Sequence, residues 1–284
     1  MPDDCVVAYY EVKTMRLKVL VDNNTYIDKY FSGEPALSFY IEIEDKRILF
    51  DTGYSDIVLR NADKMGIDLK QLTHIVVSHG HNDHSNGLKY LVEEIGIANV
   101  KLIAHQDCFL PKMDGDEYIG APYSKEEIQE LTEYLQSETI MDITEQLIYL
   151  GEIPRKNDFE SKEPIGKQEK NGKWEDDYLL DDTALVYKAL EGLFIITGCS
   201  HSGICNIIEY AKKICDDDRV LGVLGGFHLF EDNEQLQKTI DYLVACQVKQ
   251  LYPCHCVSLV AKAKMMNQLP VVEVGVGMEI LIEV

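Results

Sequence analysis

Several features that would point to a membrane or to nucleic acid are missing from this sequence. No apolar run approaches the ~20 residues that a membrane helix needs, and no apolar segment follows a basic region near the start. Basic residues are scarce, since 27 Lys and Arg stand against 49 Asp and Glu, and the formal net charge is -22. Because this charge repels phosphate backbones and acidic lipid surfaces, we expect neither nucleic acid nor a membrane as a partner. The same absences predict a cytoplasmic protein.

A disulfide framework is also absent. A chain of 284 residues that is 46% hydrophobic can bury a core without covalent cross-links. The cysteines are scattered and show no regular spacing, and we expect reduced thiols at Cys5, Cys108, Cys199, Cys205, Cys215, Cys246, Cys254 and Cys256.

Strand and helix patterns alternate along most of the chain. Strand-like apolar runs cover residues 36–44, 47–53, 73–79, 100–105, 183–189, 192–198, 219–226, 248–254 and parts of 271–284. Helical patterns cover residues 55–67, 86–96, 203–215 and 233–247. Hairpins at both ends with helix-strand units between them predict an α/β fold, in which two packed sheets are covered by helices. No repeat or linker divides the chain, so we expect a single domain over residues 1–284.

The segment from about Pro111 to Asp181 interrupts this alternation. Ser124 and Glu127 have the spacing of a capping box, which predicts a helix over residues 124–136. Residues 155–182 are charged, poor in apolar side chains and contain the single tryptophan, Trp174. Such a stretch is either a solvated loop or a mobile cover over an active site. The aromatic side chain favours the cover, and we expect Trp174 to contact the substrate.

Three of the eight histidines fall within six positions, in the stretch VVSHGHNDHSNGL at residues 76–88. The spacing of His79 and His81 sends both side chains to one side, while Asp83 and His84 can reach a second position. Imidazole nitrogens and carboxylates are ligands of Zn²⁺, Fe²⁺ and Mn²⁺. Because the cluster directly follows a buried strand, the sequence predicts a metal site at the end of that strand.

The pattern His79-x-His81-x-Asp83-His84, preceded by ILFDTG, resembles the metallo-β-lactamase superfamily. The resemblance implies an αββα four-layer sandwich of mixed sheets, with two divalent metal ions held between the sheets. It also implies that Asp51 of DTG supports the metal loop by hydrogen bonding, against the alternative of a plain turn aspartate. SHGHNDHSNGL, TGCSHSGICNI, GGFHL and PCHC resemble most closely one branch, the dihydropterin-methyl ribofuranosylaminobenzene phosphate synthases and their bacterial relatives.

Further ligands are expected at later strand ends. The family usually presents another histidine, a bridging aspartate and a final histidine, and His255 fits the last of these. No histidine lies between His105 and His201, and the strand that usually ends in Gly-Asp ends in Gly-Cys. We therefore expect His201 as a ligand and Cys199 as a weaker candidate for the bridging position. Cys254 and Cys256 are assigned to packing.

The implied chemistry is hydrolysis of a small ester, lactone or phosphate-bearing molecule by a metal-bound hydroxide. Zinc is the expected metal, with iron and manganese as alternatives. Asp83 would bind one ion and orient the nucleophile, and His228, or else His201, would give a proton to the leaving group. For His228 we expect contact with the substrate or with a ligand, against the alternative of direct metal ligation. Two alternatives stay open: condensation of a dihydropterin diphosphate with an arylamine ribofuranosyl phosphate, and a non-enzymatic metal-dependent binding protein.

Overall fold

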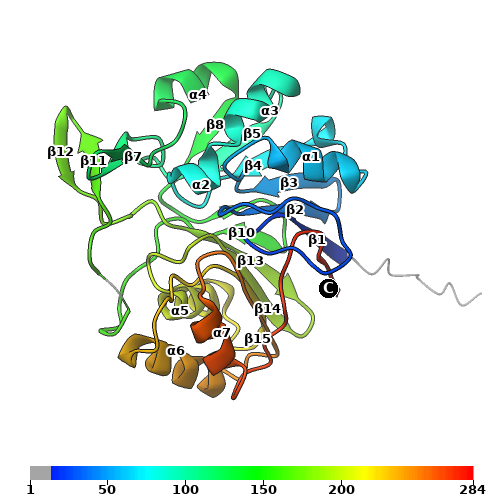
Figure 1. Ribbon diagram of the computed structural model, residues 1–284, viewed down its shortest axis with the longest axis vertical. Coiled ribbons are helices and arrows are strands. Elements are labelled where there is room, and N and C mark those ends of the chain that lie inside the picture. The colour runs from blue at the N-terminus through cyan, green and yellow to red at the C-terminus, as the bar shows by residue number, and fades with distance from the viewer. Residues whose placement is uncertain (1–13, 161, 284) are drawn as a thin grey trace, which may run out of the picture.

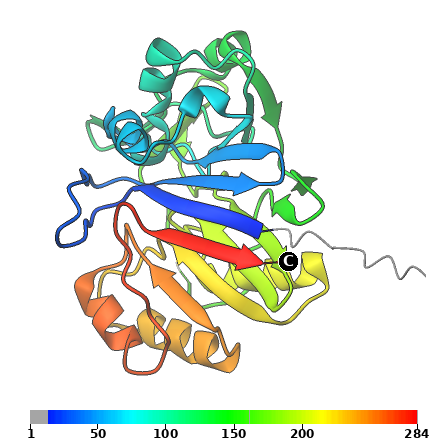
Figure 2. The same ribbon diagram turned by 90° about the vertical axis from the view of Figure 1, so that its right-hand side faces the viewer.

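Two mixed β-sheets pack face to face, and helices cover the outer face of each sheet (Figures 1 and 2). This computed structural model describes residues 14–160 and 162–283, so Cys5 lies outside the described part. The arrangement is the expected αββα sandwich. No helix in the described ranges is long and apolar enough to cross a membrane.

The seven-stranded sheet has the order β17-β1-β2-β3-β4-β5-β8. Its strands are β1 (Thr14–Val21), β2 (Ser38–Ile43), β3 (Lys46–Phe50), β4 (His74–Val76), β5 (Lys101–Ala104), β8 (Glu133–Gln136) and β17 (Glu279–Glu283). The pairs from β17 to β3 are antiparallel, and those from β3 to β8 are parallel. The helices on this side are α1 (Ile57–Lys64), α2 (Asn82–Ser85), α3 (Leu88–Glu94) and α4 (Lys125–Leu131), with a 3-10 turn at Leu69–Gln71.

The six-stranded sheet has the order β16-β15-β14-β13-β10-β9. Its strands are β9 (Met141–Asp142), β10 (Leu147–Tyr149), β13 (Ala184–Ala189), β14 (Gly192–Thr197), β15 (Val220–Gly225) and β16 (Gln250–Pro253). It is covered by α5 (Ile204–Cys215), α6 (Glu234–Ala245) and α7 (Leu259–Met265). The pairs β14–β15 and β15–β16 are parallel, so their carboxyl ends meet at one edge.

Burial on both faces explains the continuous apolar runs of the central strands. In β14, Phe194 and Ile196 pack in the core between the sheets, whereas Leu193 and Ile195 pack against the helices. Successive side chains of a strand point to opposite faces, so a strand with two covered faces needs apolar residues at every position. A third core fills the space between the seven-stranded sheet and its helices.

The segment expected to be irregular contains more regular structure than its composition predicts. The capping box at Ser124 is present, but α4 ends at Leu131 and Glu133–Gln136 is a strand that pairs with β5, so the predicted helix is too long. Leu135 packs toward the central core and Tyr134 toward the outer one, which is the alternation of a strand. Both faces of β8 thereby gain apolar contacts that a continued helix would lose.

A small sheet forms within the same segment, in the order β12-β11-β6-β7. Its strands are β6 (Lys112–Asp114), β7 (Glu117–Tyr118), β11 (Lys167–Lys170) and β12 (Lys173–Asp176). The hairpin β11–β12 stands at the periphery of the molecule (Figure 1). The expectation of an irregular segment from about Pro111 to Asp181 is therefore wrong for this part, because the pairing of β11 with β6 and of β12 with β11 satisfies backbone groups that the sequence alone leaves open.

Candidate metal centre

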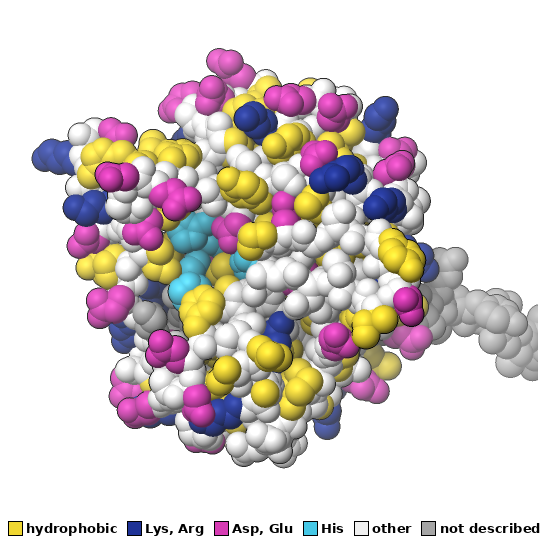
Figure 3. Space-filling view, in the orientation of Figure 1, with side chains coloured by type: hydrophobic (Ala, Val, Ile, Leu, Met, Phe, Trp, Pro, Cys, Tyr) yellow, Lys and Arg dark blue, Asp and Glu magenta, His cyan; other side chains and the backbone are white. Residues whose placement is uncertain are grey.

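Loops that follow strands of both sheets meet at one edge of the sandwich and form a cleft of about 520 Å³. The histidines gather in this hollow and are surrounded by acidic and apolar side chains (Figure 3). The ligand-type residues that line this cleft are His81, Asp83, Cys199, His201 and His255. His79 and His84 are buried directly behind them, where His79 packs against His81 and His84 against Cys199. The structure thus brings together every residue that the sequence nominated as a ligand.

A first group consists of His79, His81 and His201. Their ring centroids lie 4.7 to 5.2 Å apart, and the Nε2 atom of each ring is buried without a hydrogen-bond partner. Buried polar atoms are rarely left unpaired, so three such nitrogens in one place point to a bound cation. Burial lowers the pKa of His79 and His201 well below the usual value and that of His81 to about 4. All three rings are neutral at pH 7, which is the form that binds a metal.

A second group consists of Asp83, His84, Cys199 and His255. His84 Nε2 lies 3.1 Å from Cys199 Sγ and 3.2 Å from His255 Nε2, and Asp83 Oδ2 lies 3.2 Å from His255 Nε2. Ligand atoms about 2 Å from a tetrahedral ion are themselves about 3.3 Å apart, so these spacings fit one divalent cation. The acidic and imidazole groups also stabilise one another. Burial raises the pKa of Asp83, but the effect of His84 and His255 is larger, so the pKa of this carboxyl lies below its usual value.

Cys199 Sγ belongs to both groups, since it lies within 4.8 Å of His79 and His201 as well as of the second set. Burial raises the pKa of its thiol well above the usual value. Without a cation the sulfur is therefore a neutral thiol, and a cation would favour the thiolate. The position fits the bridging role that the sequence assigned to this residue.

Asp51 supports the second group from behind. Its carboxylate accepts hydrogen bonds from Ser78 N and Ser78 Oγ, both at 2.7 Å, and lies 2.7 Å from His84 Nδ1. This contact leaves His84 Nε2 directed at the other ligands. Burial lowers the pKa of His84, but Asp83 and Asp51 outweigh it and raise the pKa above the usual value. The hydrogen bonds are those expected of a supporting aspartate.

Two glycines allow the loops to approach this closely. A Cβ atom on Gly80 would lie 1.9 Å from the carbonyl oxygen of Cys108, and one on Gly198 would lie 2.1 Å from Ser78 Oγ. Any side chain at Gly198 would thus displace the serine that holds Asp51. The histidine motif and the Gly-Cys strand end depend on glycine for steric reasons.

Sequence reasoning missed the acidic and amide residues that hold the loops. Asp22 Oδ1 accepts a hydrogen bond from His255 N at 2.8 Å, and Asn23 Oδ1 lies 3.1 Å from His255 Nδ1. Asp181 accepts from Gly80 N at 2.8 Å, and Asp182 accepts from Ser202 N at 2.9 Å. The available signal was position, since Asp181 and Asp182 directly precede an apolar strand and Asp22 directly follows one.

Three further residues differ in their placement. His228 lines the cleft, with its ring 4.7 Å from that of His201, and joins neither group of ligand atoms. Trp174 lies on β12 with 47% of its surface exposed and is not among the residues that line the cleft. Cys254 packs in the central core as expected, but the packing assignment of Cys256 is wrong, since it lines the cleft. β16 ends at Pro253 and His255 has a positive φ of 50°, so strand alternation does not extend to Cys256, whose Sγ lies 3.7 Å from the carbonyl oxygen of Cys199.

The comparison with known families agrees with this geometry. Residues 32–212, more than half of the chain, match the model of the metallo-beta-lactamase superfamily. The chain belongs to this superfamily. Members usually bind divalent metals, which accords with the two groups of converging ligand atoms.

Individual relatives of this superfamily member cover nearly the whole chain. It is 38% identical over 257 residues to an uncharacterized protein of Methanocaldococcus jannaschii, covering 88% of this chain and 93% of that one. It is 31% identical over 273 residues to the 7,8-dihydropterin-6-methyl-4-(beta-D-ribofuranosyl)-aminobenzene-5'-phosphate synthase of the same organism, covering 91% and 92%. The crystal structure of Tm1679, described as a metal-dependent hydrolase of the beta-lactamase superfamily, matches with a TM-score of 0.79 and 30% identity over 94% of this chain and 98% of that one.

Proposed function

We propose that this protein is a metal-dependent hydrolase that acts on a small ester, lactone or phosphate-bearing molecule. The observation that carries the proposal is the convergence of buried, unpartnered imidazole nitrogens beside a carboxylate and a thiol at the bottom of a cleft. His79, His81 and His201 would hold one divalent ion, and Asp83, His84 and His255 a second, with Cys199 between them. Zinc is the expected metal, because imidazole and thiol together suit it.

Divalent ions at these positions would lower the pKa of water toward neutrality and polarise a carbonyl or phosphoryl oxygen. Asp83 is placed to orient the attacking oxygen, since it lines the cleft and its carboxylate also contacts His255. His228 stands beside His201 and is assigned proton transfer to the leaving group. Burial lowers the pKa of His228, so the resting imidazole is neutral; it would first take up a proton released by the attacking water and then pass it to the leaving group.

The charge of the cleft favours a substrate without several negative charges. Asp114 and Glu117 stand among its described lining residues, and none of these is Lys or Arg. Arg155 lines a smaller adjoining cavity, where its guanidinium donates to the carbonyl oxygens of Tyr178 and Leu179. An ester or lactone therefore suits the cleft better than a diphosphate, whose charge would have to be neutralised by the metals alone.

A second candidate is the synthase-type condensation of a dihydropterin diphosphate with an arylamine ribofuranosyl phosphate. The 31% identity to the synthase across most of both chains supports it. The two candidates use the same ligands and differ in what attacks the substrate, water or an arylamine.

The test assays the zinc-, iron- and manganese-loaded protein against lactones, aryl esters, phosphodiesters and the pterin diphosphate with its arylamine. Hydrolysis that is lost in His84→Ala and kept in the exposed surface variant Lys70→Ala would support the hydrolase. Release of diphosphate that requires the arylamine would support the synthase instead. Saturable binding of these molecules without turnover, at full metal content, would refute both.

A further inference from the structure

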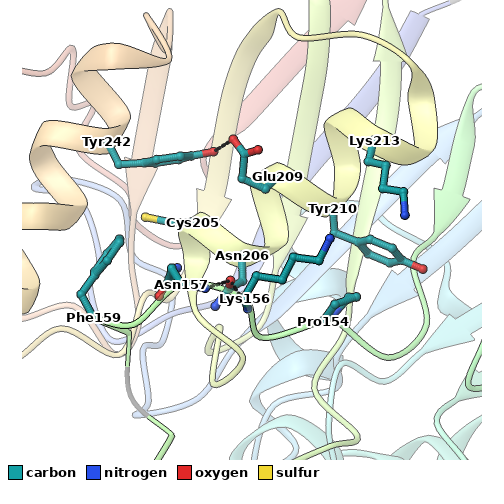
Figure 4. A pocket seen from close by; sticks show the side chains of 10 residues that line it. All are labelled: Pro154, Lys156, Asn157, Phe159, Cys205, Asn206, Glu209, Tyr210, Lys213 and Tyr242. Carbon is teal, nitrogen blue, oxygen red and sulfur yellow. Dashed lines mark hydrogen bonds between the residues drawn. The ribbon is translucent and has the colours of Figure 1, made fainter.

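A second cavity, of about 390 Å³, lies beside α5 on the outer side of the six-stranded sheet. It is bounded by α5, α6 and the segment 154–159, and it shares no lining residue with the metal cleft (Figure 4). Its size is that of a site for a small molecule.

One half of this cavity is apolar. The rings of Phe159 and Tyr242 and the thiol of Cys205 lie on the same side of the view (Figure 4). The carboxylate of Glu209 is already neutralised, because Tyr242 Oη donates to it at 2.5 Å and Lys212 Nζ lies 3.1 Å from it. Flat apolar groups could pack here without meeting an unpaired negative charge.

The other half is cationic. The ammonium groups of Lys156 and Lys213 point toward the side of the cavity where Tyr210 lies (Figure 4). Lys212 is paired with Glu209, but neither Lys156 nor Lys213 forms an ion pair with a described residue. In a chain with a formal net charge of -22, two such lysines at one apolar cavity are complementary to an anion.

The wall that carries Lys156 is preformed. Asn206 Oδ1 accepts hydrogen bonds from the backbone N–H groups of Lys156 and Asn157, at 2.9 and 3.2 Å. Glu160 accepts from the backbone N–H groups of Cys205 and Asn206, at 2.8 and 3.0 Å. The segment is thereby fixed to the start of α5, and a ligand need not order it on binding.

We propose that this cavity is a binding site for a small aromatic carboxylate. The aromatic body packs between Phe159 and Tyr242, and the carboxylate lies between the ammonium groups of Lys156 and Lys213. The site is independent of the metal centre and of the reaction proposed for it.

The test is calorimetric titration of the metal-loaded protein with three matched probes, namely indole-3-acetate, indole-3-acetamide and tryptamine. A preformed cavity of this kind should bind indole-3-acetate with a Kd of about 1 mM or below. The neutral amide should bind about tenfold more weakly, and the cationic amine not measurably. The double variant Lys156→Met/Lys213→Met should bind indole-3-acetate about tenfold more weakly. The control variant Lys101→Met, which replaces an exposed lysine on β5, should bind it with unchanged affinity.

Three results would overturn the proposal. One is no saturable binding of the acetate up to about 10 mM. Another is equal affinity for acetate and amide, which would remove the role of the lysines. The third is binding that survives in the double lysine variant and disappears in His84→Ala, because that result places the carboxylate at the metal centre.

Discussion

At the level of single residues, Cys199 is where the two groups of ligands meet. We expect His201→Ala to lose the metal equivalent of the first group and His84→Ala that of the second. Cys199→Ala should weaken both equivalents by about tenfold or more, because its sulfur lies in both groups. Equilibrium dialysis followed by elemental analysis measures each equivalent, with Cys246→Ala as a control outside the cleft. Unchanged affinity of both equivalents in Cys199→Ala would show that the thiol does not bridge.

His74 provides a pH prediction at the opposite end of β4. Burial and the nearby Lys101 and Lys46 lower its pKa from 6.5 to about 4. The folded protein therefore keeps this ring neutral where the unfolded chain protonates it, and the stability it contributes is lost as pH falls below about 6.5. The difference in unfolding free energy between the natural protein and His74→Gln should shrink from pH 7 to pH 4 in urea titrations. A difference that does not vary with pH would contradict the lowered pKa.

For single residues, the sequence predicted which side chains are candidate ligands but not their backbone conformation. The sequence nominated the candidate ligands, because His, Asp and Cys that directly follow apolar strands are typical of metal sites. It did not reveal that Asp51, Ser200, His228 and His255 adopt positive φ. Such conformations are costly for residues other than glycine and depend on surrounding contacts, such as the bond from His255 N to Asp22, 233 positions away.

Among the elements, β6 is tied to the metal loop through a buried lysine. Lys112 Nζ lies 2.6 Å from Asp177 Oδ2 and 3.2 Å from Asp181 Oδ1, and all three side chains are buried. Asp181 also accepts the hydrogen bond from Gly80 N. Burial lowers the pKa of Lys112, but the two carboxylates outweigh it and raise the pKa to about 12. The small sheet is thereby anchored beside the ligands.

Removing this lysine should strongly destabilise the folded protein. Lys112→Met leaves two buried carboxylates without their partner, and we expect the free energy of unfolding to fall by about 3 to 5 kcal/mol. Urea denaturation followed by circular dichroism measures the loss, and Lys70→Met, on the exposed surface, provides the control. A loss below about 1 kcal/mol would mean that water or another cation replaces the ammonium group.

Most elements were predictable where both faces are buried, but the largely buried strands β1 and β10 lie outside the predicted strand runs. The strands and helices around β4, β14, β15 and α5 agree with the apolar patterns because packing in two cores dictates them. The small sheet could not be predicted in this way, since Lys167–Lys170 and Lys173–Asp176 are mostly exposed and polar. Their strand conformation comes from the backbone pairing of β11 with β6 and of β12 with β11, which leaves no pattern in the side chains.

For the whole molecule, the layered architecture follows from the sequence, but the assembly of the cleft does not. Ligands come from segments between His79 and His255, and the parallel strands bring them to one edge. The acidic rim formed by Asp114 and Glu117 belongs to the small sheet, so its place in the cleft depends on how that sheet docks. This docking involves residues far apart in the chain, such as Lys112 and Asp177. Their pairing cannot be predicted from any local sequence pattern.

The final strand completes the larger sheet beside its first. β17 pairs with β1 from Thr14↔Glu283 to Lys18↔Glu279, and Ile280 and Ile282 enter the central core. A chain that stops at residue 278 should therefore self-associate, because one edge of β1 and an apolar surface beside it become open. Light scattering at equal concentration would show a larger mass than that of the full chain. An unchanged mass would contradict this expectation.

The same pairing imposes an order on biosynthesis. On the ribosome β1 is made before β17, so the nascent chain carries an unpaired edge of β1 until β17 has been made. Unpaired strand edges recruit other chains, and a neighbour on the same messenger RNA is the nearest source. The growing polypeptide is therefore prone to association through this edge until β17 pairs with β1 and completes the sheet.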